Sequence, residues 1–347
     1  MPTAAHRLVG VPLADGWTAV KLVPRDPATA TGGHFSVGYE AIHVEGHKGF
    51  LKALDFPKAF GSADPALVLQ AMTSAFIFER DTLNACRDRS LDRIVTARAA
   101  GTATIANYAI GAVPYLVFDM AEGDVRRHLA AAARFDLAWR FKCLHHVATG
   151  LKQLHSIGIA HQDLKPSNVL TYVGGKESRI GDLGRASRQG VAAPHDNAGI
   201  AGDMTYAPPE LLYDHVDPDW ATRRLGCDVY LLGSLIMFFF ADVNFTHCLV
   251  SALDPAVHPR SWRGRYADVL PHVRDAFNRV LGVFESDVRR ATPLSGSEVV
   301  EMVRRLCDPD PKLRGDPNHR GTAAHYSLER YISRLDNLAY KARLGRA

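Results

Sequence analysis

Three polar side chains that could carry out group-transfer chemistry lie within six residues of one another, at Asp163, Lys165 and Asn168. Apolar residues flank them, so a short loop pinned between two buried strands would hold the three side chains in fixed directions. Asp163 could accept the proton of an attacking hydroxyl, and Lys165 could neutralise a migrating phosphoryl group. Asn168 offers a carbonyl oxygen to a hard cation such as magnesium. The pattern predicts a catalytic loop for phosphoryl transfer, which depends on positioning and charge neutralisation.

A lysine and a glutamate upstream of this loop form a second candidate pair. Lys52 is the only charge in the apolar run 50–54, and a lone lysine in a half-buried strand needs a partner or a ligand. The alternative is an outward-facing lysine on an edge strand. A helix is predicted over 65–87, with Asp64 as its N-cap, and its apolar pattern includes Glu79. We therefore expect Glu79 to form an ion pair with Lys52.

These segments together resemble those of a known enzyme family. The loop His161–Asn168 is similar to the H-R-D-L-x-x-x-N catalytic loop of protein kinases, and Lys165 stands where the serine/threonine branch has a lysine. Asp182-Leu183-Gly184 resembles the D-F-G motif, and Pro208-Pro209-Glu210 resembles A-P-E with proline in place of alanine. The Lys52 strand resembles V-A-I-K. The chain thus resembles the eukaryotic-like serine/threonine protein kinase family over most of its length.

The resemblance implies a fold class and a domain organisation. The expected fold is α+β and bilobal, with a small β-rich N-terminal lobe over 15–120 and a large helical C-terminal lobe over 121–320. Residues 321–347 would add an amphipathic helix packed on the large lobe. The extra length in 241–307 has no counterpart in a minimal kinase, and the resemblance assigns it no role.

The resemblance also implies cofactors and the roles of individual residues. The two lobes would clamp ATP with Mg²⁺, and Lys52 would hold the α- and β-phosphates. Asp182 and Asn168 would bind magnesium, Asp163 would orient the substrate hydroxyl, and Lys165 would steady the γ-phosphate. The expected substrate is a serine or threonine hydroxyl of a protein, the kinase's own chain among the candidates.

A glycine-bearing segment at 31–41 is the candidate phosphate-covering loop. Glycine lets backbone N–H groups approach phosphate closely. Gly33 would be the central glycine of the kinase loop and Phe35 its tip, whereas Thr31 and Ser36 stand where the outer glycines would be. A plain β-turn is the alternative interpretation.

The segment 110–120 ends in a predicted strand and is similar to the start of the kinase hinge. Phe118 would guard the back of the adenine pocket, and Ala121 would offer backbone hydrogen bonds to adenine. Asp124 would meet the ribose hydroxyls, although an acid in the first turn of a helix has an equally good structural role.

Four further residues match positions that organise a kinase C-terminal lobe. Glu210 would pair with a buried arginine, for which Arg314 is the candidate, and Asp228 would cap the backbone of the catalytic loop. Thr205 matches the threonine that bonds the catalytic aspartate and lysine. The polar stretch 185–205 would be the activation segment.

One position departs from the family pattern in a way that bears on regulation. Gln162 stands in place of the arginine of H-R-D, which holds a phosphorylated activation segment through charge-assisted hydrogen bonds in many kinases. Glutamine cannot supply that charge. We therefore hypothesise that activity does not require phosphorylation at Thr205 or Ser187.

Bulk composition constrains the setting only broadly. The chain has 347 residues, 47% of them hydrophobic, and a formal net charge of +4, which gives no reason to expect a nucleic-acid partner. The five cysteines are scattered without a C-x-x-C pair, so a reducing cytoplasm is expected.

No signal peptide is expected, because the N-terminus lacks a basic region followed by an apolar run. The apolar run 229–241 falls short of the roughly 20 residues that span a bilayer, and predicts a buried core helix. Nothing indicates an oligomeric state.

Two other functions compete with a protein kinase. A small-molecule phosphotransferase of the aminoglycoside or choline kinase type shares the two-lobed fold, but generally lacks the Pro-Pro-Glu element and the lysine at 165. A pseudokinase would act as a binding scaffold, and it would usually have lost Lys52, Asp163 or Asp182. All three are present, while the degenerate glycine-bearing loop keeps this alternative open.

Overall fold

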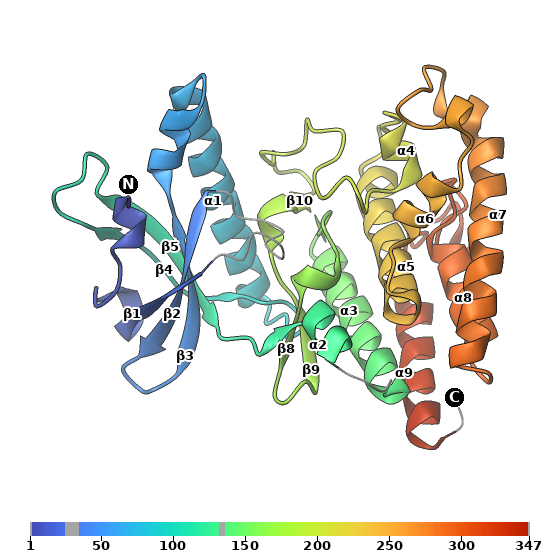
Figure 1. The fold of residues 1–347 in the computed structure, drawn as a ribbon, viewed down its shortest axis with the longest axis horizontal. Coiled ribbons are helices and arrows are strands. Elements are labelled where there is room, and N and C mark those ends of the chain that lie inside the picture. The colour runs from blue at the N-terminus through green and yellow to red at the C-terminus, as the bar shows by residue number, and fades with distance from the viewer. Residues whose placement is uncertain (1, 25–34, 132–135, 346–347) are drawn as a thin grey trace. The chain divides into compact units, whose positions relative to one another are not determined.

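The computed structural model describes residues 2–24, 35–131 and 136–345. The chain divides into two compact units, which are described separately below (Figure 1). The N-terminal unit consists of Met1–Glu122 and Gly181–Gly184, and the C-terminal unit of Gly123–Ile180 and Arg185–Ala347. The first division, after Glu122, lies close to the lobe boundary expected after residue 120. Gly33 and Thr31 lie outside the described residues.

The N-terminal unit is built on a five-stranded antiparallel sheet with strand order β1-β2-β3-β5-β4. Burial alternates along β3, where Leu51 and Ala53 are buried and Lys52 points to the other face. This alternation frees Lys52 to meet a group outside the sheet. The strands are β1 Trp17–Val23, β2 Ser36–His43, β3 Lys48–Leu54, β4 Ala97–Thr104 and β5 Ala112–Asp119.

Helix α1, Pro65–Asp88, provides the glutamate expected opposite Lys52. Its start follows from local chemistry: the Asp64 carboxylate accepts a hydrogen bond from the Leu67 N–H at 3.0 Å, and Pro65 occupies the first turn. The helix packs against β4 and against the 3-10 turn Phe56–Gly61. The predicted helix over 65–87 is confirmed to within one residue.

Residues 2–16 pack on one face of the sheet and complete its core. Leu8 is fully buried, and the Tyr39 hydroxyl donates to the Ala5 carbonyl oxygen at 2.6 Å. The Ala14 N–H donates to the Tyr115 hydroxyl oxygen at 2.7 Å. The same apolar cluster includes residues from β1 to β5. The core of this unit therefore extends before residue 15, where the sequence analysis placed the start of the lobe.

The C-terminal unit is mainly helical, with short strands next to the catalytic loop. Strands β6, β8 and β9 form one small sheet, and β7 pairs with β10. The strands are β6 Gly123–Asp124, β7 Ile159–Ala160, β8 Val169–Tyr172, β9 Glu177–Ile180 and β10 Ser187–Arg188. The helices are α2 Val125–Ala131, α3 Leu137–Ser156, α4 Pro209–Leu212, α5 Gly226–Ala241, α6 Phe245–Ser251, α7 Tyr266–Ala291, α8 Gly296–Leu306 and α9 Glu329–Arg343.

Helix α5 is the central core element of this unit. Together with the π-helical turn Ala221–Leu225 it forms a continuous helix over Ala221–Ala241, whose 21 residues are long and apolar enough to cross a membrane by length and composition alone. The length argument made for the apolar run 229–241 is therefore wrong for the whole helix. However, 78% of its most apolar window is buried within the fold, as in the core helix of a folded domain. That burial confirms the predicted buried core helix.

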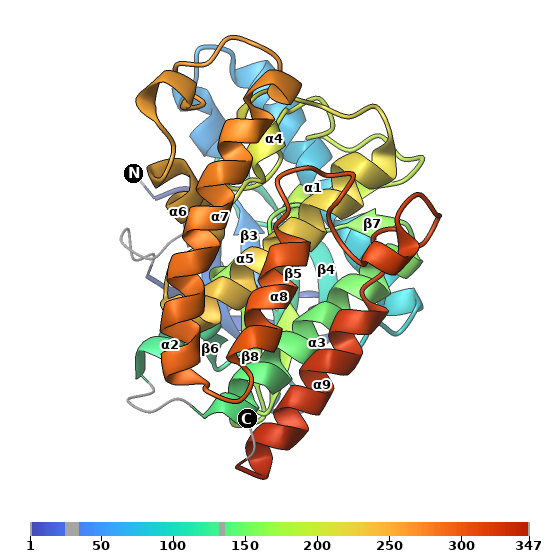
Figure 2. The ribbon, with the colours of Figure 1, turned by 90° about the vertical axis from the view of Figure 1, so that its right-hand side faces the viewer.

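Helices α6 to α9 account for the C-terminal third of the chain. Helix α7 with α8 and α6 fills most of the region 241–307 and packs against α5. Helix α9 runs alongside α3 (Figure 2), where Lys142 pairs with Asp336 at 3.1 Å. The helix expected within 321–347 therefore forms and packs on the C-terminal unit, as predicted.

Candidate active site

A buried carboxylate of helix α5 holds the backbone of the catalytic loop in place. The loop connects β7 to β8, and Asp228 of α5 accepts hydrogen bonds from the His161 and Gln162 N–H groups at 2.7 and 2.8 Å. Asp228 is fully buried, and the His155 Nε2 atom lies 2.9 Å from its Oδ2 atom. The predicted capping of the loop backbone by Asp228 is confirmed. A carboxylate with several donors fixes the loop to the core of the unit.

The three predicted catalytic side chains converge within this loop. The Lys165 Nζ atom lies 3.2 and 3.1 Å from the two carboxylate oxygens of Asp163. The Asn168 side-chain amide donates to the Asp163 carbonyl oxygen at 2.7 Å and to its Oδ2 atom at 3.3 Å. All three residues are buried, with exposed fractions of 4–7%. The Asp163 carboxylate is therefore held in one orientation by its own loop.

A residue that the sequence analysis did not single out, Asp203, completes this cluster. Its backbone N–H donates to the Asp163 Oδ1 atom at 2.8 Å, and its carboxylate lies 3.3 Å from the Lys165 Nζ atom. The Thr205 hydroxyl and N–H both donate to the Asp203 carboxylate, at 2.7 and 3.0 Å. Burial raises the pKa of Asp203, but the bonds from Thr205 and Lys165 outweigh it, so the pKa lies below its usual value.

This arrangement corrects the expectation for Thr205. Its hydroxyl was predicted to bond Asp163 and Lys165, but it donates to Asp203, which makes both of those contacts instead. The physical reason is reach: Asp203 stands two residues closer to the loop and presents both a backbone N–H and a carboxylate. The available signal was an acid two residues before the threonine, in a segment with few acids.

In the N-terminal unit, the predicted ion pair between Lys52 and Glu79 is present. The Lys52 Nζ atom lies 2.8 and 2.9 Å from the two carboxylate oxygens of Glu79. The Glu79 side chain is 9% exposed and that of Lys52 is 29% exposed. Burial raises the pKa of the Glu79 carboxyl and Asp182 adds to this, while Lys52 opposes it. The pair is thus buried at its acidic end and open at its basic end.

Asp182 lies near the same lysine. Its Oδ1 atom is 3.8 Å from the Lys52 Nζ atom, and its side chain is 39% exposed. The backbone of Asp182 has a φ of 60°, in the left-handed region that aspartate tolerates. The next residue, Leu183, is fully buried. The Asp-Leu-Gly turn therefore anchors itself through the leucine and directs a carboxylate toward Lys52.

The remaining predicted site residues have less distinctive surroundings. Phe35 is 42% exposed, and Ala121 is half-buried. Asp124 accepts hydrogen bonds from the Arg126 and Arg127 N–H groups, at 2.9 and 3.2 Å, at the start of α2. The structural role considered for Asp124 is therefore present, while a contact with ribose stays a prediction.

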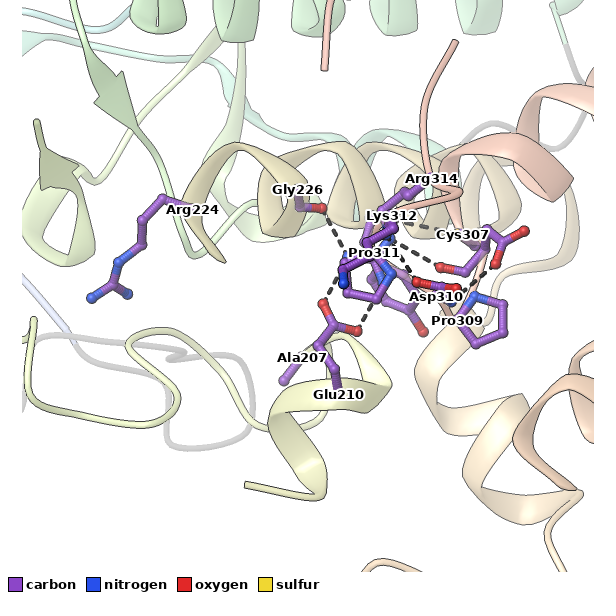
Figure 3. Close-up of polar contacts among 12 residues, drawn as sticks. Ala207, Glu210, Arg224, Gly226, Cys307, Pro309, Asp310, Pro311, Lys312 and Arg314 are labelled. Carbon is purple, nitrogen blue, oxygen red and sulfur yellow. Dashed lines mark hydrogen bonds and ion pairs between the residues drawn. The ribbon is translucent and has the colours of Figure 1, made fainter. Parts of the chain in front are cut away.

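Glu210 and Arg314 form the buried ion pair expected in the C-terminal unit (Figure 3). The guanidinium donates to both carboxylate oxygens, at 2.7 and 2.8 Å. It also donates to the carbonyl oxygens of Gly226 and Asp308, at 3.1 and 3.0 Å. Arg314 is fully buried. This pair joins the end of the activation segment to the start of α5 and to the loop after α8.

Comparison with known proteins identifies the family. Residues 102–319 match the family model described as protein kinase domain. The chain belongs to this family. The match begins after Lys52 and Glu79, so the assignment of those two kinase residues rests on the motif and on the geometry above.

The chain is similar to several serine/threonine kinases over part of their lengths. It is 28% identical to serine/threonine-protein kinase PTK2 of Candida glabrata over 193 residues, which are 50% of this chain and 24% of that protein. It is 35% identical to probable cyclin-dependent kinase 8 of Dictyostelium discoideum over 126 residues, 33% of this chain and 32% of that protein. It is 34% identical to Aurora/IPL1-related protein kinase 2 of Caenorhabditis elegans over 144 residues, 40% of this chain and 45% of that protein. Each match therefore covers less than half of the relative.

Protein kinase domains generally use ATP and Mg²⁺, and the oxygen donors of this chain suit that cation. The Asn168 amide nitrogen donates to Asp163, so its side-chain carbonyl oxygen, which accepts from the Ser167 hydroxyl at 3.4 Å, is the atom that could bind a cation. Asp182 offers a partly exposed carboxylate. Within the described ranges, no group of three or more histidine, cysteine, aspartate or glutamate side chains could hold a metal by itself. An amide oxygen and a carboxylate are oxygen donors of the kind that magnesium prefers, and proteins commonly bind this ion through one or two side chains together with substrate phosphates.

Proposed function

We propose that this protein is an active serine/threonine protein kinase, which transfers the γ-phosphate of Mg-ATP to a serine or threonine hydroxyl of a protein, its own chain included. The observation that carries the proposal is the arrangement around Asp163. A carboxylate that is buried, held by Lys165 and by the Asp203 N–H, and mounted on a loop capped by Asp228 is oriented for one task.

In the C-terminal unit, that task is to receive the proton of the attacking hydroxyl. Asp163 holds the hydroxyl by accepting its hydrogen bond, which orients the oxygen lone pair toward the phosphorus atom. Lys165 is paired with both Asp163 and Asp203, and it supplies positive charge that stabilises the phosphoryl group during transfer. Asn168 positions its amide oxygen for a cation while its amide nitrogen braces Asp163.

In the N-terminal unit, Lys52 and Asp182 act on the nucleotide. Bound Mg-ATP supplies the transferable phosphoryl group, with the metal screening the phosphate charge. Lys52 would donate to the nucleotide phosphates, and Glu79 holds the ammonium group in place through both of its oxygens. Asp182 would contribute a carboxylate ligand to the cation. Phe35 and Gly33 would cover the phosphates, and Ala121 and Asp124 would contact adenine and ribose.

The cellular setting is a further part of the proposal. The five cysteines are free thiols, which suits a reducing compartment. We therefore propose a cytoplasmic kinase whose substrates are proteins.

The proposal is tested by phosphate transfer from γ-labelled ATP with magnesium, to the protein itself and to a generic protein substrate. We expect Asp163→Asn to lower turnover by about 100- to 10,000-fold, because it removes the proton acceptor, while nucleotide binding measured by thermal shift is retained. Asp214→Asn is the matched control, because it makes the same chemical change at an exposed position of the same unit.

The other outcomes separate the competing functions. Nucleotide binding without transfer to any protein would favour a small-molecule phosphotransferase. Absence of both transfer and nucleotide binding would favour a scaffold without catalytic activity. A loss of nucleotide binding in Asp163→Asn equal to its loss of turnover would mean that the substitution damages the fold.

A further inference from the structure

The side chain of Gln162 is buried, and it contacts Arg224 as well as the Asp228 carboxylate, to which its amide nitrogen donates at 3.3 Å. Gln162 is 4% exposed and has a φ of 67°. Its amide nitrogen donates to the Arg224 carbonyl oxygen at 2.8 Å, and the Arg224 guanidinium donates back to its amide oxygen at 3.2 Å. The catalytic loop is therefore linked to the turn that precedes α5 through Gln162, at the position where the family pattern has an arginine.

Arg224 brings a buried positive charge to this position. It is 3% exposed and extends from the turn before α5, apart from Arg314 (Figure 3). Its Nη2 atom donates to the Asp196 carbonyl oxygen and to the Asp196 carboxylate, both at 3.1 Å. Burial lowers the pKa of Arg224 and Arg223 adds to this, whereas Asp196 opposes it. An arginine nevertheless remains charged in a protein, so it needs a buried or half-buried anion.

Asp196 is that anion, and several parts of the activation segment converge on it. Its carboxylate accepts from the Ala193 N–H at 2.7 Å and from the Ser187 hydroxyl at 3.1 Å. Ser187 lies in β10, which pairs with β7 directly before the catalytic loop. The Arg223 guanidinium also donates to the Asp196 carbonyl oxygen, at 2.8 Å. One carboxylate thus joins the first half of the segment to the turn before α5.

We propose that Asp196 and Arg224 form a built-in anchor that holds the activation segment against the catalytic loop without a phosphate group. The anchor is defined as Asp196, Arg224 and Gln162, with Arg224 contacting both of the others. A phosphorylated side chain placed opposite an arginine orders a loop by adding negative charge and acceptor oxygens. Asp196 supplies a permanent negative charge of the same kind, and Arg224 supplies the cation that Gln162 lacks. This inference rests on the proposed kinase function.

The anchor acts through the position of the segment and not through the nucleotide. The same segment carries Asp203, which contacts both Asp163 and Lys165. Releasing Asp196 would therefore loosen the part of the segment that braces the catalytic aspartate. Asp196, Arg224 and Gln162 are positioning residues, and their loss should affect transfer to protein more than the binding of nucleotide.

The test compares the full chain with Asp196→Asn, Arg224→Gln and the double variant, each treated with phosphatase and checked by mass spectrometry for phosphate at Ser187 and Thr205. The wild type is expected to keep its activity after this treatment. Each single variant should lose about 10- to 100-fold in kcat/KM for a protein substrate, and the double variant should lose no more than the worse single variant. Arg224→Lys should recover part of the loss, because it restores the charge.

Matched controls are Asp214→Asn and Arg260→Gln, which make the same chemical changes at exposed positions of the same unit. Both should retain wild-type transfer. All variants should keep the wild-type thermal shift with nucleotide, which a general loss of folding would not allow.

Several results would overturn the anchor. They are loss of wild-type activity after phosphatase treatment, unchanged activity in the single variants, or losses that multiply in the double variant. Amide hydrogen exchange tests the anchor separately from the proposed kinase function. If the wild type transfers no phosphate, the anchor still predicts faster exchange over residues 185–205 in Asp196→Asn than in the wild type, and equal exchange would contradict it.

Discussion

Two ion pairs, one in each unit, have the same charges and opposite surroundings. Glu210 and Arg314 have side chains that are 7% and 0% exposed, and the arginine has two further carbonyl acceptors. Its guanidinium also lies 5.1 Å from the centroid of the Tyr230 ring. In the other pair, Glu79 is 9% exposed but Lys52 is 29% exposed.

The difference indicates which pair serves structure and which serves chemistry. A buried charge pair is stable only when every donor and acceptor is matched, and removing one partner leaves an uncompensated charge. Arg314 makes four hydrogen bonds, two to Glu210 and two to carbonyl oxygens, so we call this pair a fixed joint, meaning a pair that holds the fold together. Lys52 has a partly exposed side chain near Asp182, so its pair can bind a ligand. The predictions below are ordered by their expected effect on the free energy of unfolding.

The largest effect is expected at the fixed joint. Arg314→Met keeps most of the side-chain volume but leaves Glu210 buried without its cation, so the free energy of unfolding should fall by about 3–5 kcal/mol. Urea denaturation measures this change. Arg304→Met, at a position with a 44% exposed side chain, is the control and should stay within about 0.5 kcal/mol of the wild type. An equally small loss for Arg314→Met would contradict the assignment of a fixed joint.

A smaller effect on stability, with a large effect on activity, is expected at Lys52. Lys52→Met should lower the free energy of unfolding by about 1 kcal/mol, because the lysine is partly solvated and Glu79 can bind a proton when it loses its partner. Phosphate transfer should fall by about 100-fold or more. Lys48→Met, at an exposed position of the same strand, is the control. Comparable losses in both variants, or a stability loss as large as at Arg314, would erase the contrast between the pairs.

A third pair, Lys165 with Asp203, sharpens the comparison through its pH dependence. The folded-state pKa of Asp203 lies below its ordinary value of 3.8, so its stabilising contribution is present above the unfolded pKa and is lost as the pH falls through the folded value. Asp203→Asn should therefore cost roughly 1 kcal/mol or less at about pH 7 and pH 5 alike, with a smaller cost below about pH 4. Urea denaturation at each pH gives the difference. If the cost of Asp203→Asn instead grew as the pH fell, the predicted direction of the Asp203 pKa shift would be wrong.

Much of the site could be predicted from sequence because motifs fix both residue type and order. Lys52 is identified by its isolation in an apolar strand, and Glu79 by its place in the helical pattern. The Glu210–Arg314 contact and the capping by Asp228 follow from the family resemblance, and the structure contains both. In each case a charged side chain stands in an apolar sequence context, where a charge without hydrogen-bonding partners would be costly.

What could not be predicted lies in polar segments without periodicity. Asp203 and Asp196 stand among small and polar residues, where an acid is ordinarily solvated, and nothing local indicates which cation each will meet. Arg224 lies 62 positions from Gln162 in the chain, and neither residue carries a pattern that points to the other. The membrane-length criterion failed for a different reason, because the helix continues through a π turn that the apolar run does not mark.

The segment 2–16 also decides where this domain can be cut. The family match begins at residue 102, and the first strand of the sheet begins at Trp17, so either position would look like a natural place to start a recombinant fragment. A fragment starting at Trp17 would lose the buried Leu8 and would leave the Tyr39 hydroxyl without the Ala5 carbonyl. If such a fragment aggregated, the cause would be the apolar face of the sheet that residues 2–16 normally cover. The aggregation would not bear on whether the protein transfers phosphate.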